Sequence, residues 1–229
     1  MAGVERHLEV VRTARYWTLG DDVASPSEVW FVLHGYRQLA GRFLARFAAI
    51  DDGTRRIIAP EGLSRFYVGR EAGRHGPASV VGATWMTRED RDREIHDYVR
   101  YLDRLAEVSL AELEPEIPVV VLGFSQGVAT AARWTTLGAM RPQRLILWGD
   151  FLPPDLDGFR AVTAWADTEV LLVRGADDGV FADEDLLAAE RQRLEAVGLR
   201  LPAHTYVGGH DVLPEVLAAV ATRSGPFGA

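Results

Sequence analysis

One serine of the chain lies in a sequence pattern that can make its side chain reactive. Ser125 is the centre of Gly123-Phe124-Ser125-Gln126-Gly127, which follows an apolar run and precedes a stretch of small residues. Where a strand turns sharply into a helix, such a serine is presented clear of the sheet, and the flanking glycines leave room for the strained backbone. The first turn of the helix offers free N–H groups to a developing negative charge. The pattern therefore predicts a nucleophilic serine.

A serine nucleophile needs a base, and the base needs an acid that orients it. After this kind of turn the acid and then the histidine are expected further along the chain. His210 lies in a glycine-flanked run directly after a predicted strand and before a predicted helix. Asp177 and Asp178 both follow the preceding predicted strand, and their spacing alone does not choose between them. Asp150, which follows another predicted strand, is a third candidate for the acid.

The other five histidines are weaker candidates for the base. His204 lies inside a predicted strand, His96 lies on a charged helix, and His7 has no informative neighbours. His34 precedes the first loop and is expected to support the backbone there. His75 lies in a long loop from which it could reach a substrate.

The composition excludes several other kinds of catalysis. The 229 residues include no Cys, Lys or Asn, and all 25 basic residues are Arg. Thiolate chemistry, cysteine-ligated metals, lysine Schiff bases and a P-loop lysine are thereby ruled out. The acidic run at 89–94 alternates with Arg, which would repel a cation, so it is interpreted as the solvated start of a helix. We predict no metal and no cofactor.

Charge and hydropathy indicate which kinds of partner and location the sequence disfavours. The net charge is −8 and no basic stripe stands out, which disfavours binding to nucleic acid. No apolar stretch approaches the roughly 18 residues of a membrane-spanning helix. The first residues carry Glu and Arg where a signal peptide would have an apolar run. We expect a cytoplasmic protein that acts on a small molecule and has no integral membrane segment; whether it forms a homodimer stays open.

Short apolar runs alternate with helical patterns along the chain. The runs are nearly continuous in hydrophobicity, as expected for strands that are buried on both faces of a parallel sheet. They span 28–33, 56–59, 118–122, 144–148, 169–173 and 203–207, and 8–19 could add one or two antiparallel edge strands. Helices are predicted at 38–50, at 88–108 with Thr87 as the N-cap, and at 125–137, 183–197 and 212–222.

This order of elements predicts an α/β protein with a mostly parallel, doubly wound sheet flanked by helices. A single domain over residues 1–229 accounts for it, since no repeat or linker interrupts the alternation. The segment 60–86 breaks the rhythm and is too long for a simple connection. We expect this segment to lie over the functional site.

With these motifs the chain resembles the phospholipase/carboxylesterase family of α/β-hydrolases, which includes the acyl-protein thioesterases. The resemblance covers most of the chain after Glu28. It is carried by Leu33-His34-Gly35 at the start of the oxyanion loop, Gly123–Gly127 at the nucleophile elbow, Trp85 in a loop motif, Phe151-Leu152-Pro153 as an aromatic-Leu-Pro turn, Gly175-Ala176-Asp177-Asp178 as Gly-x-x-Asp, and Gly209-His210 at the catalytic histidine. The resemblance places Asp178, rather than Asp177, in the acid position.

The chain departs from the family pattern at four places. Tyr36-Arg37-Gln38 stands where the family has another glycine, so the oxyanion loop is expected to have a different shape. Val128 replaces the glycine that follows the elbow, and Thr87 replaces an acidic residue after the loop Trp. Gly149-Asp150 stands where family members carry Ser-Gly before the aromatic-Leu-Pro turn.

The residues and the resemblance together imply a serine carboxylesterase that acts on small to medium acyl esters through an acyl-enzyme. Ser125, His210 and Asp178 would form the triad. The backbone N–H groups of Tyr36 and Gln126 would bind the oxyanion. An acyl thioesterase or lysophospholipase with the same triad is the alternative, and a catalytically silent hydrolase-fold binding protein is an alternative of another class.

The predicted substrate-binding residues are aromatic or apolar and lie in segments that could border the site. They are Phe66, Tyr67, Trp85, Phe151 and Leu152. The chain leaves no room for a separate cap domain, which favours an open cleft.

Overall fold

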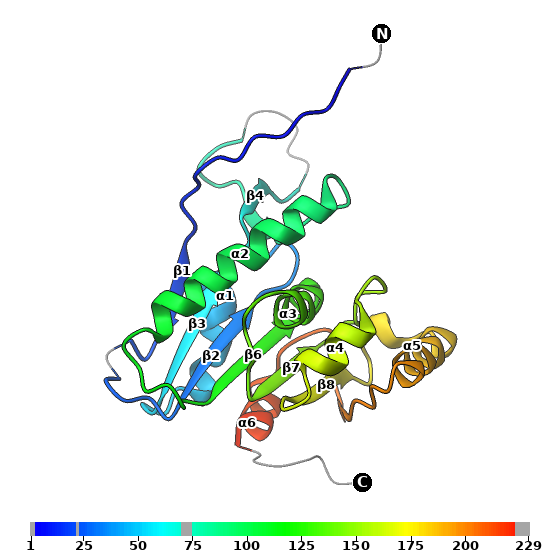
Figure 1. The fold of residues 1–229 in the computed structure, drawn as a ribbon. Coiled ribbons are helices and arrows are strands. Elements are labelled where there is room, and N and C mark those ends of the chain that lie inside the picture. The colour runs from blue at the N-terminus through cyan, green and yellow to red at the C-terminus, as the bar shows by residue number, and fades with distance from the viewer. Residues whose placement is uncertain (1–2, 22, 70–74, 223–229) are drawn as a thin grey trace.

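The computed structural model describes residues 3–21, 23–69 and 75–222, and its main feature is a seven-stranded sheet. The strand order is β1-β3-β2-β6-β7-β8-β9 (Figure 1). All neighbouring strands are parallel except β1 and β3, which are antiparallel. The strands are β1 (Tyr16–Leu19), β2 (Glu28–Leu33), β3 (Arg55–Pro60), β6 (Val119–Phe124), β7 (Arg144–Trp148), β8 (Glu169–Gly175) and β9 (Ala203–Tyr206).

Helices cover both faces of this sheet. The first face carries α2 (Arg91–Leu110), α3 (Gln126–Leu137), α4 (Gly158–Ala164) and α5 (Glu184–Ala196). The second face carries α1 (Ala40–Leu44), the 3-10 helix η1 (Ala45–Ile50) and α6 (Pro214–Thr222) (Figure 1). The doubly wound arrangement predicted from the sequence is confirmed.

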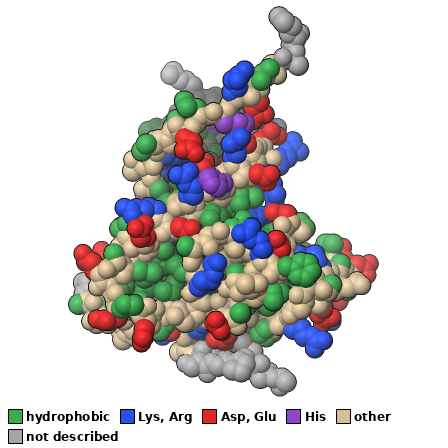
Figure 2. Space-filling view, viewed as in Figure 1, with side chains coloured by type: hydrophobic (Ala, Val, Ile, Leu, Met, Phe, Trp, Pro, Cys, Tyr) green, Lys and Arg blue, Asp and Glu red, His purple; other side chains and the backbone are tan. Residues whose placement is uncertain are grey.

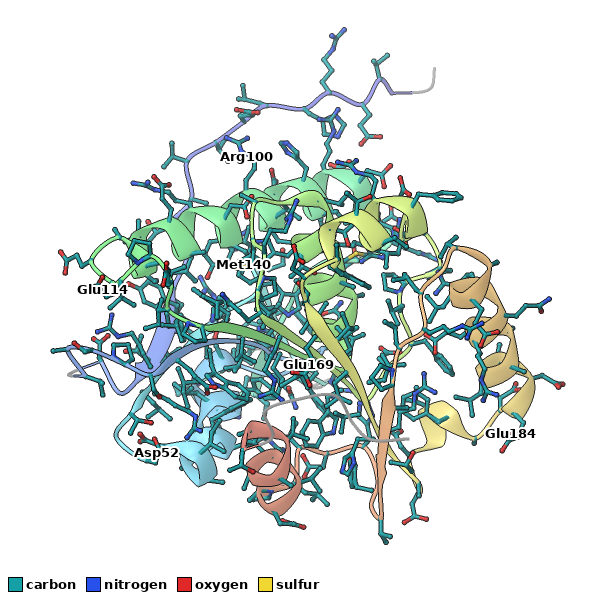
Figure 3. All side chains as sticks on the ribbon, turned by 60° about the horizontal axis from the view of Figure 1, so that its bottom comes forward. Asp52, Arg100, Glu114, Met140, Glu169 and Glu184 are labelled. Carbon is teal, nitrogen blue, oxygen red and sulfur yellow. The ribbon has the colours of Figure 1, made fainter. Side chains whose placement is uncertain are left out.

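The central strands are mostly apolar because both of their faces are buried. In β2, Val29 and Phe31 pack with the helices of the first face, whereas Trp30 and Val32 pack with those of the second. Successive residues of a strand point to opposite faces, so a strand between two helical layers needs an apolar residue at every position. Side chains accordingly crowd both sides of the sheet in Figure 3.

Several element boundaries differ from the predicted ones. Only Tyr16–Leu19 of the segment 8–19 forms a strand, and the helix predicted at 38–50 divides into α1 and η1. Thr87 is not the N-cap of α2. Asp90 holds that position in a left-handed conformation, and the N–H of Thr87 instead donates to the Glu94 carboxylate at 2.6 Å.

The segment 60–86 contains a small hairpin that the sequence analysis missed. Strands β4 (Ser64–Tyr67) and β5 (Val81–Thr84) pair antiparallel and form a separate two-stranded sheet. Residues 70–74, between them, lie outside the described residues. Helix α4 and the short 3-10 helix η2 (Gly179–Phe181) were also not predicted.

The N-terminal residues 3–15 form neither a helix nor a strand and extend from β1 along the outside of the molecule (Figure 1). Acidic and basic side chains are interspersed on the face shown in Figure 2, and no broad basic patch lies on that face. Within the described ranges, no helix is both long and apolar enough to span a membrane.

Candidate active site

Ser125 lies in the turn between β6 and α3, with φ 53° and ψ −122°, a backbone conformation that residues with side chains rarely adopt. Its N–H donates to the carbonyl oxygen of Trp148 at the end of β7, at 2.9 Å. A Cβ on Gly123 would overlap the backbone oxygen of Gly127, and a Cβ on Gly127 would overlap that of Leu33. The close approach of β6, α3 and β2 therefore requires both glycines of the motif.

His210 and Asp178 form a hydrogen-bonded pair at the same edge of the sheet. Nδ1 of His210 lies 2.8 Å from Oδ2 of Asp178. The Asp178 side chain is buried, and its Oδ1 accepts the N–H of Val180 at 3.0 Å. A carboxylate held on both oxygens keeps the proton on Nδ1 of the imidazole, so that Nε2 is free to accept a proton.

The imidazole of His210 lies against the turn that holds Ser125. Its ring centroid is 4.9 Å from that of Phe124, the residue before the serine. A Cβ on Gly149 would lie 3.4 Å from Cε1 of His210, and a Cβ on Gly35 would lie 3.1 Å from Cβ of Ser125. The described residues show no hydrogen bond from the Ser125 hydroxyl to His210; in unliganded enzymes this contact is often formed only when substrate binds.

The structure distinguishes the acids that spacing alone could not separate. Asp178 carries the hydrogen bond to His210, whereas Asp177 is exposed and joins the site only through its N–H, which donates to Gly208 at 2.9 Å. Asp150 is half-buried after β7, and none of the hydrogen bonds of the described chain joins it to His210.

Two aromatic residues that the sequence analysis left without a role hold the His210 loop. The hydroxyl of Tyr206 lies 2.8 Å from the carbonyl oxygen of Gly209 and 2.6 Å from that of Asp211, and it accepts Nε1–H of Trp148 at 3.2 Å. Burial raises the pKa of Tyr206, so its hydroxyl stays protonated and able to donate. The carboxylate of Asp211 also forms an ion pair with Arg46.

The backbone N–H groups of Tyr36 and Gln126 are free to bind an anion. Gln126 begins α3, where N–H groups have no partner within the helix, and neither N–H donates to a group in the part of the chain that the structure describes. The loop of Tyr36 is fixed to β5, because the N–H of Arg37 donates to Ala83 at 3.0 Å. Arg37 has φ 66°, a conformation that glycine adopts at lower cost.

The side chain of Gln126 joins the start of α3 to the end of the hairpin. Its Oε1 accepts the N–H of Trp85 at 3.1 Å, and its Nε2 donates to the carbonyl of Met86 at 2.9 Å. This contact fixes the backbone at the proposed oxyanion position from a segment some forty residues earlier in the chain.

His34 supports the backbone next to Ser125 from inside the core. Its Nε2 accepts the N–H of Gly62 at 3.0 Å, and its Nδ1 then donates to the carbonyl of Gly35 at 2.8 Å. Burial lowers the pKa of His34 to about 4, so the ring is neutral at physiological pH. Trp85 stacks on this ring with centroids 5.0 Å apart and donates Nε1–H to the carbonyl of His34.

The five predicted substrate-binding residues divide into two groups. Trp85 and Leu152 are buried in the core on the first face, each 2% exposed, so their side chains lie in the protein interior. Phe66 stacks on Tyr36 at a centroid distance of 5.3 Å, beside the oxyanion loop. Tyr67 is exposed and stacks on His75, and Phe151 is half-buried against Phe181.

One group of side chains in the described ranges has the composition of a metal site. Glu5, His7 and Asp90 could each offer a ligand atom, and these atoms lie within 4.8 Å of one another. All three residues are exposed, and His7 already lies 3.1 Å from a carboxylate oxygen of each acid. Exposed acidic groups of this kind are common without a metal, so we do not interpret the cluster as a metal site.

Comparisons with known proteins identify the fold. No family model matches the sequence, and no curated protein sequence matches it. Among solved structures, acyl-protein thioesterase 2 of Zea mays aligns at 17% identity over 91% of this chain and 96% of its own, with a TM-score of 0.66. A carboxylesterase from Mesorhizobium loti gives 17% identity, 92% and 95% coverage and a TM-score of 0.66. The carboxylesterase of Bacillus cereus aligns at 15% identity over 90% of this chain and 91% of its own, with a TM-score of 0.59.

At these identities the likeness shows the fold: the chain has the α/β-hydrolase fold, as predicted. The matched structures include an acyl-protein thioesterase and two carboxylesterases, proteins of the kind that the sequence motifs resemble.

Proposed function

We propose that the protein is a serine hydrolase that cleaves carboxylic esters of small to medium acyl groups. The observation that carries the proposal is the hydrogen-bonded His210–Asp178 pair beside a serine held at positive φ on a strand–helix turn. A serine is kept in such a strained conformation where its hydroxyl has to be exposed for attack. The carboxylesterases and the acyl-protein thioesterase among the structural neighbours support the same class of reaction.

In the first half-reaction Oγ of Ser125 attacks the ester carbonyl carbon while Nε2 of His210 takes the hydroxyl proton. The carbonyl π electrons move to oxygen, and the N–H groups of Tyr36 and Gln126 bind the oxyanion. Each such donor contributes about 3 kcal/mol in the transition state. The imidazolium of His210 is stabilised by Asp178, which stays ionised.

The tetrahedral intermediate then collapses, the bond to the leaving oxygen breaks, and His210 donates its proton to the departing alcohol. This leaves an acyl group on Ser125. In the second half-reaction water attacks the acyl carbon as His210 removes a proton, and collapse of the second intermediate releases the acid and returns the proton to Ser125.

An acyl thioesterase is the second candidate, because one structural neighbour carries that activity in its name. Thioester hydrolysis, like that of a lysophospholipid ester, would use the same triad and the same two oxyanion donors. Relative turnover of oxygen and sulfur esters with the same acyl chain separates the two activities. A silent binding protein would have no use for a strained serine beside a supported imidazole.

The test is hydrolysis of chromogenic esters from acetyl to dodecanoyl by the wild type, Ser125→Ala and the control Ser109→Ala, which changes a serine in the last turn of α2. We expect turnover to fall at least about a thousandfold in Ser125→Ala only, since the nucleophile is removed. The chain-length optimum gives the size of the acyl site. Equal activity in Ser125→Ala and the wild type would show that Ser125 is not the nucleophile. No activity in the wild type would favour the silent binding protein.

A further inference from the structure

The loop after β7 places a second carboxylate beside His210. Asp150 follows Gly149, whose added Cβ would lie 3.4 Å from Cε1 and 3.5 Å from Nδ1 of His210. The residue before Gly149, Trp148, accepts the N–H of Ser125. Asp150 therefore directly follows the residue that lies beside the proposed base, and it comes two residues after the one that bonds the proposed nucleophile.

The Asp150 carboxylate has only one of its oxygens occupied. Oδ1 accepts the N–H of Phe151 at 2.8 Å. Oδ2 has no hydrogen-bond partner in the described chain and is not among the polar atoms that are fully buried without one, so it keeps some exposed surface. The side chain as a whole is half-buried.

The nearby cations are already engaged. Nη2 of Arg174 lies 2.5 Å from Oε2 of Glu190, and Nη2 of Arg193 donates to the carbonyl of Leu152 at 3.3 Å. Asp178 and Glu190 add negative charge around Asp150, and His210 is a counter-charge only when protonated. Burial and these carboxylates raise the pKa of Asp150, although the Phe151 N–H and His210 oppose the shift.

Partial burial without a permanent counter-charge makes an ionised carboxylate less stable, and a cationic group on a bound ligand would offset that cost. The leaving group has to reach Nε2 of His210 to be protonated, so it lies near the same ring that a Cβ on Gly149 would approach. Resting on the proposed function, we propose that Asp150 selects substrates whose leaving alcohol or thiol carries a cationic group such as an ammonium.

Two thioesters with the same acyl group and nearly the same shape test this proposal. Acetylthiocholine carries a quaternary ammonium on the leaving thiol, and 3,3-dimethylbutyl thioacetate replaces the nitrogen by carbon. The ratio of their kcat/KM values is measured in the wild type, in Asp150→Asn, and in Asp177→Asn, which removes one exposed negative charge from the neighbouring loop. Asn keeps an oxygen for the Phe151 N–H, and Asp150→Ser is a second variant should Asp150→Asn fail to fold.

We expect the wild type to prefer the cationic thioester by about tenfold at low salt, a preference that salt weakens. The ratio falls to about one in Asp150→Asn and stays at the wild-type value in Asp177→Asn. A ratio that is the same in the wild type and Asp150→Asn would overturn the role of Asp150 while the neutral thioester still reports hydrolysis. Failure of the wild type to cleave either thioester or any chromogenic ester would overturn the proposed function and this inference together.

Discussion

The loops after β7 and β8 each bring a carboxylate close to His210, but the two carboxylates differ in burial and in their hydrogen-bond partners. Asp178, after β8, is buried with one oxygen on His210 and the other on the N–H of Val180. Asp150, after β7, is half-buried with one oxygen on Phe151 and the other unpartnered in the described structure. Two identical groups can take different roles when their environments differ in this way.

The difference does not come from looseness of the β7 loop. The N–H of Leu152 donates to Oε1 of Glu190 at 2.7 Å, and the carbonyl of Leu152 accepts from Arg193, so α5 holds the loop at both backbone groups. Asp150 is therefore a fixed group in a supported loop. A fixed acid with an open oxygen is suited to contact a ligand, whereas a fixed acid with both oxygens occupied is suited to orient the imidazole.

Among substitutions at these two carboxylates, Asp178→Asn has the largest expected effect on turnover. Asn keeps the size of the side chain but has no charge, and its amide can donate to Nδ1, which would leave the proton on the wrong imidazole nitrogen. We expect kcat for a chromogenic ester to fall about 10³–10⁴-fold. Asp177→Asn keeps wild-type turnover, and Asp150→Asn loses less than about tenfold on the same neutral ester. A larger loss in Asp150→Asn than in Asp178→Asn would reverse the roles assigned to the two loops.

Tyr206→Phe tests whether support of the His210 loop matters for the rate. The change removes the hydroxyl that bonds the carbonyls of Gly209 and Asp211 and leaves the ring in place. We expect a loss of about 1 kcal/mol in the free energy of unfolding and about tenfold in kcat, with KM nearly unchanged. Tyr101→Phe is the matched control, because its hydroxyl donates to the carbonyl of Arg15 on the N-terminal segment. An equal loss of kcat in both variants would make the effect of Tyr206 one of general stability.

The sequence was sufficient where the determinants are local. The elbow at Ser125 could be predicted because its glycines and the strand before it are contiguous. The central parallel strands could be predicted because burial on both faces leaves them mostly apolar. The hairpin was missed because β4 has four residues of mixed exposure, which is a weak strand pattern. Resolving Asp178 from Asp177 required the resemblance, since both follow the same strand and only the turn directs one side chain to His210.

The hydrogen bonds that hold the loops of the site could not be predicted from the sequence, because they join residues far apart in the chain. Trp148 and Tyr206 meet over a separation of 58 residues, and Gln126 meets Trp85 over 41, so no local spacing signals either contact. Trp85 shows the opposite case. As an aromatic residue in a segment that could border the site it was predicted to contact substrate, but its side chain is buried and its indole holds His34 in the core.

The smallest expected effect concerns stability, and it separates the two carboxylates without any substrate. Because burial raises the pKa of Asp150, the folded state binds its proton more tightly than the unfolded chain does, and the ionised carboxylate lowers stability above that pKa. Asp150→Asn removes the charge and should raise Tm by a few degrees near neutral pH. The gain should shrink as the pH is lowered from neutral into the acid range, where Asp150 becomes protonated. Thermal unfolding of the wild type, Asp150→Asn and Asp177→Asn across this range measures the difference, and Asp177→Asn should follow the wild type because that side chain is exposed. A lower Tm for Asp150→Asn near neutral pH would mean that the carboxylate is already satisfied within the fold, and an acid that the fold satisfies has no need of a cation from the substrate.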